Sequence, residues 1–303
     1  MESLETAGGF LFLLLGIYVA AEMAVLHFRR HALRLREART TLFGALSVGV
    51  AVAIALRLAL PVSVALFASA GIALSPVGSL GTGVLAWIAG WLVYEFWYWF
   101  QHWAAHQVRL LWCIHSPHHA PRSIHMMVGA NHHFVESALY MPFFAGFMPA
   151  LFGIEPVICV ALNLVDGIWG SFLHISDQVV PKGRYGVLGR FLQTPAHHRV
   201  HHARNVRYLD RNYNSITLFW DWALGTLEPL RDEEPPDYGI TREVDTGSFW
   251  DVHFRELVLL ARDVRATRGL DRLRVLWKPP GWRPGDASHT AAARRGALIR
   301  AGG

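Results

Sequence analysis

The sequence predicts an all-α protein, an integral membrane helical bundle with a cytoplasmic, histidine-rich helical cap. Three features of the 303-residue chain support this fold class. Only 17% of the residues are charged, whereas ordinary soluble domains carry about a quarter. Apolar runs of membrane-spanning length recur up to residue 173, and three histidine clusters lie just beyond apolar segments.

Five apolar runs are close to the roughly 20 residues that a spanning helix needs. They cover approximately residues 8–26, 42–60, 80–100, 134–151 and 156–173. Glu2 and Glu5 precede the first run and no small-residue cleavage site follows it, so we expect this run to stay in the mature protein rather than act as a secretory signal. Residues 61–74 are short and begin with proline, which leaves a crossing and a re-entrant or interfacial segment both open.

An arginine-rich loop at residues 29–39 sets the predicted orientation. The positive-inside rule makes this loop cytoplasmic. The third and fifth runs then deliver His102 and His174 to the same cytoplasmic side, provided that residues 61–74 do not cross. We therefore expect a multi-pass protein with its active site on the cytoplasmic side. The Ala/Arg/Leu-rich composition favours a bacterial inner membrane over the endoplasmic reticulum.

The chain reads as soluble from about residue 177 onward. Residues 248–265 have helical periodicity and predict an amphipathic helix. Residues 285–303 are small and basic, which predicts disorder. The net charge of +5 includes no basic–aromatic stripe of the kind that follows nucleic acid, so no nucleic-acid partner is expected.

Three histidine boxes are the strongest functional signal. Histidines three or four apart on a helix share a face. Ser116-Pro117 and Thr194-Pro195 each read as an N-cap followed by the first helical residue, so we expect a helix to open at each pair. The boxes are H-x-x-x-H at His102 and His106, H-x-x-H-H at His115, His118 and His119, and His197 followed by H-x-x-H-H at His198, His201 and His202.

Metal binding explains these boxes better than satisfied surface or core histidines do. Packed imidazoles repel one another when protonated and need partners when neutral, and a metal ion removes both difficulties. Nine or ten histidines suit two ions, and imidazole suits zinc, copper, iron and nickel, so ligand type alone leaves the metal open. Cys113 and Cys159 form no C-x-x-C, which argues against a cysteine-based zinc site or a disulfide framework.

Two acids inside the apolar runs are candidates to orient a metal-binding imidazole. Glu95 lies seven residues before His102, and Asp166 lies eight before His174. Acids within a span are costly and usually functional. A snorkelling or paired acid is the equal alternative for each. The tryptophans of the third run (Trp87, Trp91, Trp97, Trp99 and Trp103) indicate an interfacial belt with core packing, or alternatively the wall of a lipid channel.

From about Tyr94 to Leu230 the chain resembles the fatty acid hydroxylase/sterol desaturase superfamily of membrane di-iron enzymes, nearest to its alkylglycerol monooxygenase-like branch. The boxes and the runs 194–205, 210–213 and 219–226 carry the resemblance, and residues 278–284 add weakly to it. The resemblance implies two iron ions bound mainly by histidine. The implied ligands are His102, His106, His115, His118, His119, His174, His198, His201 and His202, with His197 as a ligand or a supporting group.

The chain departs from the family pattern near the implied site. Glu95 stands where the family usually has Asp, and Trp103 stands where it has Arg. Residues 124–133 replace a segment that usually carries Asn and Arg. By analogy, the three histidines of that segment (His125, His132 and His133) are not ligands but remain candidates to line the substrate pocket. These departures leave the substrate open.

The resemblance implies an O2-dependent oxidoreductase that hydroxylates or desaturates a sterol, fatty acyl or ether lipid, or cleaves an ether. No haem or flavin motif is present, so electrons would come from an external donor of the cytochrome b5, ferredoxin or reductase type. The expected division is an N-terminal transmembrane region (1–79), a catalytic domain (80–230) and a C-terminal cytoplasmic extension (231–303). A membrane zinc hydrolase of a lipid or amide, and a metal transporter or sensor, are the competing readings.

Overall fold

The computed structural model describes residues 2–29, 34–55, 57 and 78–302, with side chains described from residue 13 onward. Regular structure in this part of the chain is helical, and β-pairing is limited to isolated bridges. The all-α prediction is therefore confirmed. Residues 58–77, which include the ambiguous stretch 61–74, lie outside the described residues.

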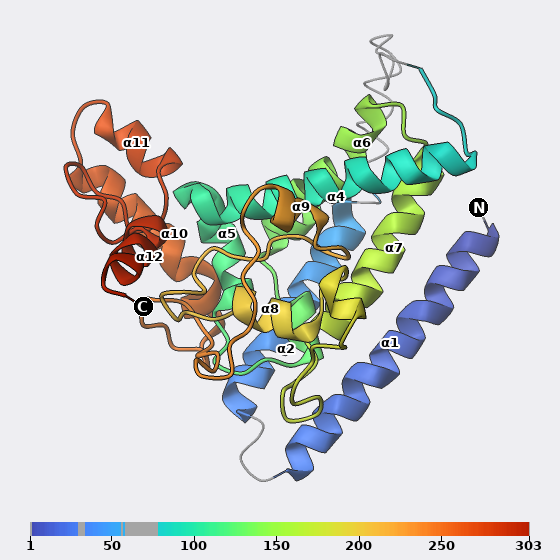
Figure 1. The fold of residues 1–303 in the computed structure, drawn as a ribbon, viewed down its shortest axis with the longest axis horizontal. Helices are drawn as coiled ribbons and strands as arrows, with labels where there is room; N and C mark the ends of the chain where they lie inside the picture. The colour runs from blue at the N-terminus through green and yellow to red at the C-terminus, as the bar shows by residue number, and fades with distance from the viewer. Residues whose placement is uncertain (1, 30–33, 56, 58–77, 303) are drawn as a thin grey trace.

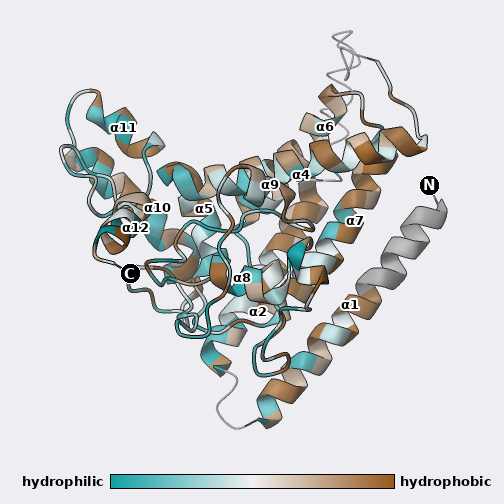
Figure 2. Ribbon diagram, viewed as in Figure 1, coloured by the Kyte–Doolittle hydropathy of each residue, from teal (hydrophilic) through white to brown (hydrophobic). Residues whose placement is uncertain are grey.

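Four long helices correspond to four of the predicted apolar runs: α1 (Glu2–Phe28), α2 (Leu35–Ile54), α4 (Val84–Gln107) and α7 (Pro156–Leu173). In Figure 1, α1 and α7 run obliquely through one half of the molecule and α4 crosses its upper edge. Brown, hydrophobic residues dominate α7 and much of α4 in Figure 2. Of the described helices, α2 and α7 are long and apolar enough to cross a membrane by length and composition.

The run 134–151 differs from the predicted regular spanning helix. It contains two π-helical segments, η3 (Glu136–Tyr140) and η4 (Phe143–Phe147), followed by α6 (Met148–Leu151). Apolarity reports burial in protein or lipid but does not distinguish α from π hydrogen bonding. π-Turns occur frequently at functional sites, and η3 begins at the buried Glu136.

The first histidine box lies in the last turns of the long helix α4, and the second and third boxes lie on or at the end of two short helices. The second box closes α5 (Arg109–His119), so the predicted helix start at Ser116-Pro117 is wrong. An extended Val108 ends α4 and allows α5 to begin at Arg109, and Pro117 falls in the last turn. The third box lies on α8 (Pro195–His201), where Thr194 is the N-cap and Pro195 opens the helix as predicted. The other short elements of this region are η2 (Met126–Ala130), η5 (Leu188–Arg190) and α9 (Phe219–Ala223).

The C-terminal part contains α10 (Phe249–Ala266), α11 (Asp271–Trp277) and α12 (Ala291–Arg300), and α10 packs against α5 and α11. Helix α10 confirms the prediction for residues 248–265. The predicted disorder of the tail is wrong for residues 291–300. The Thr290 hydroxyl accepts a hydrogen bond from the Ala293 N–H at 3.3 Å, and Arg295 donates to the Leu209 carbonyl. The N-cap and this tertiary contact stabilise a helix in a segment whose small, basic residues predicted disorder.

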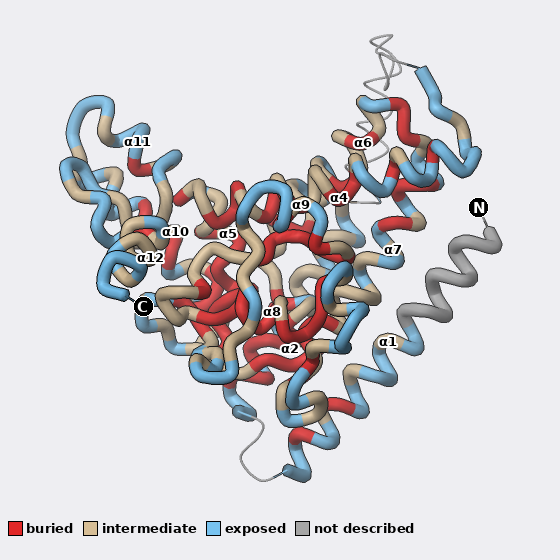
Figure 3. The backbone as a smooth tube through the Cα atoms, in the orientation of Figure 1, coloured by how far each residue is buried: buried red, intermediate tan, exposed pale blue. Residues whose placement is uncertain are grey.

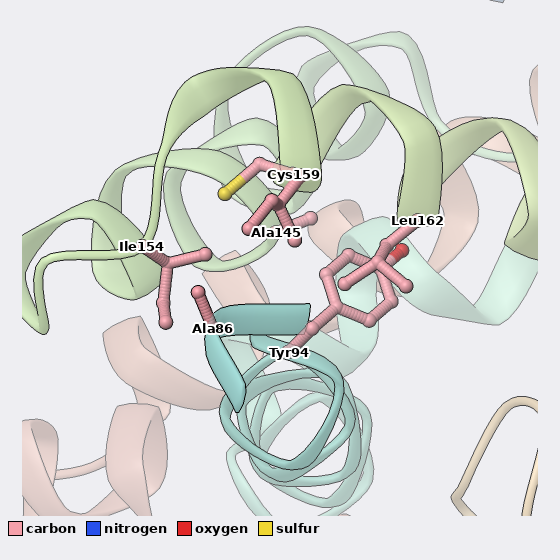
Figure 4. Packing of buried hydrophobic residues seen from close by; sticks show 7 residues of the cluster. Ala86, Tyr94, Ala145, Ile154, Cys159 and Leu162 are labelled. Atoms are coloured by element: carbon pink, nitrogen blue, oxygen red, sulfur yellow. The ribbon is translucent and has the colours of Figure 1, made fainter. Parts of the chain in front are cut away.

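A hydrophobic cluster joins α4 to α7 and to the segment between them (Figure 4). Tyr94 and Ala86 of α4 pack there with Ile154, Cys159 and Leu162. Gly90 permits the close approach, because a Cβ at this position would lie 2.8 Å from Ile158 Cγ2. This packing holds the ends of α4 and α7 next to α5 and α8, where Figure 3 shows the largest concentration of buried chain.

Candidate metal centre

The nine histidines predicted as ligands converge at the meeting point of α4, α5, α7 and α8. All nine are buried. They form two groups, and within each group one nitrogen from every residue lies within 4.8 Å of the others. The five-histidine group contains His102, His106, His115, His119 and His201, and the four-histidine group contains His118, His174, His198 and His202.

Helical geometry explains how one sequence box serves two groups. In an H-x-x-H-H box the first and last histidines are four apart and nearly eclipsed on the helix, whereas the middle one is displaced to the other side of them. In α5, His115 and His119 therefore join the five-histidine group and His118 joins the other. In α8 the allocation is reversed: His198 and His202 join the four-histidine group and His201 joins the five.

The second ring nitrogen of most of these histidines is held by an oxygen atom. The Nδ1–oxygen distances range from 2.6 Å at His115 to 3.3 Å at His106. An Nδ1–H donated to oxygen leaves Nε2 as the lone-pair nitrogen, which is the arrangement typical of liganding histidines. The pairs are His102–Tyr213 O, His106–Asp210 Oδ1, His115–Glu136 Oε1, His118–Val128 O, His174–Gly170 O and His201–Arg211 O.

The other ring nitrogen, Nε2, has in several of these histidines no hydrogen-bonding oxygen among the described residues. The Nε2 atoms of His102, His106 and His201 are buried without a hydrogen-bond partner among the described residues. In the four-histidine group the His174 Nε2 lies 2.8 Å from that of His198 and 3.1 Å from that of His202. Buried polar atoms are almost always satisfied, and converging lone pairs are satisfied together by a cation. The donor set therefore fits a transition-metal ion in each group.

Burial also favours, for the seven imidazoles named here, the neutral form that metals bind. It lowers the pKa of His174 to about 3 and that of His115 to about 4, although the Glu136 carboxylate opposes the shift at His115. Neighbouring histidines add to the effect, because each positive charge disfavours the next. Burial likewise lowers the pKa well below its usual value for His118, His119, His198, His201 and His202.

The three predicted supporting residues do not hydrogen-bond the nine imidazoles. Glu95 accepts the backbone N–H groups of Ile216 at 3.1 Å and Thr217 at 2.7 Å. It thus anchors the loop that follows Tyr213, whose carbonyl accepts from His102, and its influence on the site is indirect. Asp166 accepts the Tyr94 hydroxyl at 3.2 Å and the Ser215 hydroxyl.

His197 lies outside both groups. Its Nδ1 is 2.9 Å from the Thr194 hydroxyl, and burial lowers its pKa to about 4. The side chain therefore belongs to the N-terminal turn of α8, where it is bonded to the N-cap residue.

Two carboxylates that the sequence analysis missed contact the histidines directly. Glu136 accepts from His115 at 2.6 Å and from His132 at 3.0 Å, and the His132 ring stacks on His118 with centroids 4.1 Å apart. Asp210 contacts His106 and is also bonded by the Gln107 amide at 2.8 Å. The four-residue spacing of His132 and Glu136 was a usable signal, but nothing in the sequence indicates that His115 shares that carboxylate.

Two cavities contact the histidines, and they share none of them. The α4–α7 cavity, about 230 Å³, is lined by residues of α4, α7 and the segment 129–145. It reaches His102, His115, His118, His174 and His198. The α10–α12 cavity, about 480 Å³, is lined by residues 239–242 and by the C-terminal helices and loops. It reaches His106, His119, His201 and His202.

Other sequence candidates are distributed between these cavities and the packed interior. His132 lines the α4–α7 cavity, whereas His125 and His133 are buried and are not among the lining residues of either cavity. Trp99 is buried and donates to Asp221 at 3.2 Å. None of the five tryptophans of α4 lines either cavity, which favours packing and an interfacial belt over a channel wall.

Comparison with known proteins identifies the relatives of this chain. Residues 87–226 match the fatty acid hydroxylase family model. Alkylglycerol monooxygenase from Danio rerio is 32% identical over 62% of this chain and 40% of its own length, and the Homo sapiens enzyme is 29% identical over 66% and 43%. An ornithine lipid hydroxylase from Rhizobium tropici is 26% identical over 53% and 47%.

The chain therefore spans less than half the length of these curated relatives. No solved structure was found to match it. The resemblance to the superfamily and to its alkylglycerol monooxygenase-like branch is confirmed by the family match and these relatives.

Proposed function

Because residues 87–226 make this chain a member of the fatty acid hydroxylase superfamily, nearest to its alkylglycerol monooxygenase-like branch, we propose that it is a membrane-bound di-iron enzyme that hydroxylates a lipid with O2. The observation that carries the proposal is the pair of buried histidine groups, each with its ligand nitrogens within 4.8 Å of one another. Desaturation and ether cleavage remain alternative outcomes of the same chemistry.

The nine histidines would hold two iron ions, one in each group. When bound, iron supplies O2 activation with two external electrons and removal of hydrogen from an unactivated C–H bond, chemistry that lies beyond amino-acid side chains. The protein contributes position and environment. Tyr213 O, Asp210 and Glu136 hold three imidazoles of the five-histidine group in place, and the burial of all five side chains would restrict water.

The α4–α7 cavity is the proposed substrate site. It is lined by apolar side chains such as Val48, Met141 and Leu173, and it reaches histidines of both groups. Its walls belong partly to α7, one of the two described helices that are long and apolar enough to cross a membrane. A lipid chain held here would present a carbon to the metal pair without leaving an apolar environment.

The membrane arrangement follows from the same proposal. We propose a multi-pass protein with the histidines on the cytoplasmic side of a bacterial inner membrane, receiving electrons from a separate cytochrome b5-, ferredoxin- or reductase-type donor. The proposed division is 1–79, 80–230 and 231–303, and the family match lies within the middle part. A helical membrane base would then carry the histidine-rich cap.

The competing functions are less well supported. A zinc hydrolase needs a carboxylate free to act as a base beside the metal, but Glu136 already accepts from two imidazoles and Asp210 from an imidazole and an amide. A transporter would carry its histidines along the spans. Here they gather at the ends of α4 and α5, at the end of α7 and on α8.

The test measures O2 consumption and lipid products together. Purified full-length protein in lipid nanodiscs, loaded with Fe(II) and given a chemical reductant, should incorporate label from 18O2 into a lipid. Lipid profiles of a host with and without the protein would identify candidates. Turnover without O2, or full activity of the Zn(II)-loaded protein, would contradict the proposal and favour the zinc hydrolase.

A further inference from the structure

The first apolar helix, α1, directs one buried acid toward the histidine centre. We propose that Glu22 of α1 is a positioning residue for the four-histidine group, because its carboxylate holds the two backbone segments that support His118 and His174. This inference rests on the metal binding of the proposed function and not on lipid oxidation. Glu22 lies outside residues 87–226, which match the family model.

Glu22 is an unusual residue for its helix. Of the side chains of α1 that the structure describes, which begin at residue 13, only Glu22 and Leu26 are buried. They are four residues apart and share one face of the helix, and α1 packs against α7 and η2. Exposed apolar residues such as Leu13, Ile17 and Tyr18 cover the rest of α1. An acid on such a helix is costly and is usually functional.

Two backbone N–H groups occupy this carboxylate. Glu22 Oε2 accepts from the Met126 N–H and Oε1 accepts from the Ser176 N–H, each at 2.6 Å. Met126 is the first residue of η2, and the first N–H groups of a helix have no partner within it. Ser176 follows the end of α7. One side chain of α1 therefore joins the start of η2 to the end of α7.

The bond to Met126 acts on His118 through η2. Val128, two residues after Met126, accepts from the His118 Nδ1 at 3.1 Å. The same short helix touches the second imidazole, because a Cβ at Gly129 would lie 3.1 Å from the His174 Nδ1. A shift of η2 would therefore move the acceptor that orients one imidazole and the surface that packs against the other.

The bond to Ser176 acts on His174 through the chain that follows it. Ser176 lies two residues after His174, and Ile175 between them donates its carbonyl oxygen as acceptor to Arg199 at 3.1 Å. Arg199 belongs to α8, the helix of the third box. The segment after His174 is thus held by Glu22 of α1 on one side and by α8 on the other.

The five-histidine group is supported in a different way. Glu136 and Asp210 bond its imidazoles directly, and the carbonyls of Tyr213 and Arg211 hold two more. Within the described part of the chain, Glu22 bonds none of these four supports. Loss of Glu22 should therefore weaken one ion and spare the other, which a general role in anchoring α1 does not predict.

The experiment measures the Fe(II) affinity of each group. Full-length protein in lipid nanodiscs would be titrated anaerobically with Fe(II) alone against a chelator, which resolves two binding steps. Glu22→Gln keeps the shape of the side chain but turns an NH2 group toward one of the two N–H donors. We expect about a tenfold loss of affinity in one step and less than a twofold change in the other. Two unchanged steps, or equal losses in both, would overturn the proposal.

Two histidine variants assign the steps. In His198→Ala the remaining ion occupies the five-histidine group, and adding Glu22→Gln should change its affinity less than twofold. In His201→Ala the remaining ion occupies the four-histidine group, and adding Glu22→Gln should reproduce the tenfold loss. Coupling of this kind reports a specific link between two residues. The reverse pattern would contradict the assignment of Glu22 to the four-histidine group.

Leu26→Ala is the matched control on the same face of α1. It removes apolar packing one turn from Glu22 and leaves both N–H bonds in place. It should lower the Tm of the metal-free protein without changing the ratio of the two affinities. A change in that ratio as large as that of Glu22→Gln would make Glu22 a structural anchor only. If Glu22→Gln fails to insert, Glu22→Asp, which draws the carboxylate back by one carbon, should show the same selective loss, and its absence would overturn the proposal.

The two levels of the proposal fail differently. If the wild-type protein oxidises lipids with O2 while Glu22→Gln leaves both affinities unchanged, the positioning role is wrong and the lipid hydroxylase proposal stands. If Glu22→Gln weakens the four-histidine ion selectively but no lipid product forms in the wild-type protein, the proposed function is wrong and the role of Glu22 at the metal site stands.

Discussion

The five-histidine group and the four-histidine group differ in what holds their imidazoles. Four of the five imidazoles in the first group are bonded through Nδ1, two of them to the carboxylates of Glu136 and Asp210. In the second group two of the four are bonded through Nδ1, both to backbone carbonyls, and the His198 Nδ1 is buried without a described partner. Carboxylate partners make a liganding imidazole more basic and fix its orientation.

Two sites built from one box motif therefore need not bind metal equally. We expect the five-histidine group to hold its ion more tightly and the four-histidine group to lose its ion first. Glu136 links the two, since it bonds His115 of one group and, through His132, reaches the ring of His118 in the other.

The largest effect is expected from removing one histidine of each group. His201→Ala in the five-histidine group and His118→Ala in the four-histidine group should each abolish lipid oxidation and reduce iron from two ions per chain to one or fewer. Elemental analysis and activity assays check this, with membrane insertion as the control for folding. A variant that kept full activity and both ions would show that its histidine is not a ligand.

Glu136→Gln should have the next largest effect. The amide keeps the shape but removes the charge shared by His115 and His132, and loss of such a partner typically costs about 10–100-fold in metal affinity or activity. Competition with a chelator would measure the affinity of each ion. An unchanged affinity for both ions would show that Glu136 does not support metal binding.

Asp210→Asn should have a smaller effect on the same measurement. The Asp210 oxygen lies 3.3 Å from the His106 nitrogen and the carboxylate is partly exposed, so water can replace it. We expect a loss of about tenfold or less in the affinity of the five-histidine ion. If the weaker ion changed instead, the proposed order of the two groups would be reversed.

Lowering the pH should destabilise the metal-free protein between about pH 6.5 and 4. Burial places the pKa values of His115 and His174 at about 4 and 3 in the folded state, below the value of about 6.5 for an unfolded histidine. In this interval the unfolded chain therefore binds more protons than the folded protein does. The free energy of unfolding decreases as the pH is lowered through the interval and has its full value only above about pH 6.5. Thermal unfolding of metal-free protein across this range should show a falling Tm; a flat Tm would mean that the histidines are not buried neutral.

The smallest effect is expected at His289. Its side chain is 66% exposed, and its nearest acid, Asp286, lies 3.8 Å away at the surface. His289→Ala should change activity less than twofold and leave iron content unchanged. A large loss would indicate that the α10–α12 cavity, which His289 lines, takes part in the reaction.

Local patterns in the sequence were enough for the helical class, for most of the long helices and for the candidate ligands. Hydrophobic runs report burial or lipid exposure along a single helix, and Thr194-Pro195 reports a helix start within a few residues. The histidine boxes contained eight of the nine residues that converge in the structure, because i, i+3 and i, i+4 spacings are properties of one helix, whereas His174 was implied as a ligand by the family resemblance.

Tertiary packing decided the rest. The division of each H-x-x-H-H box between two groups depends on the angle at which α5 and α8 approach each other, which neither box specifies. The extended backbone at Val108 lets α5 begin at Arg109, so Pro117 falls in the last turn of this helix and not at its start. Residues 291–300 are helical because the Thr290 cap and the hydrogen bond from Arg295 to the Leu209 carbonyl stabilise them. The sequence singled out Asp166, which accepts from Ser215 instead of a histidine, and did not single out Glu136, which accepts from His115. The partner of a buried carboxylate comes from another part of the chain, so only the tertiary structure identifies it.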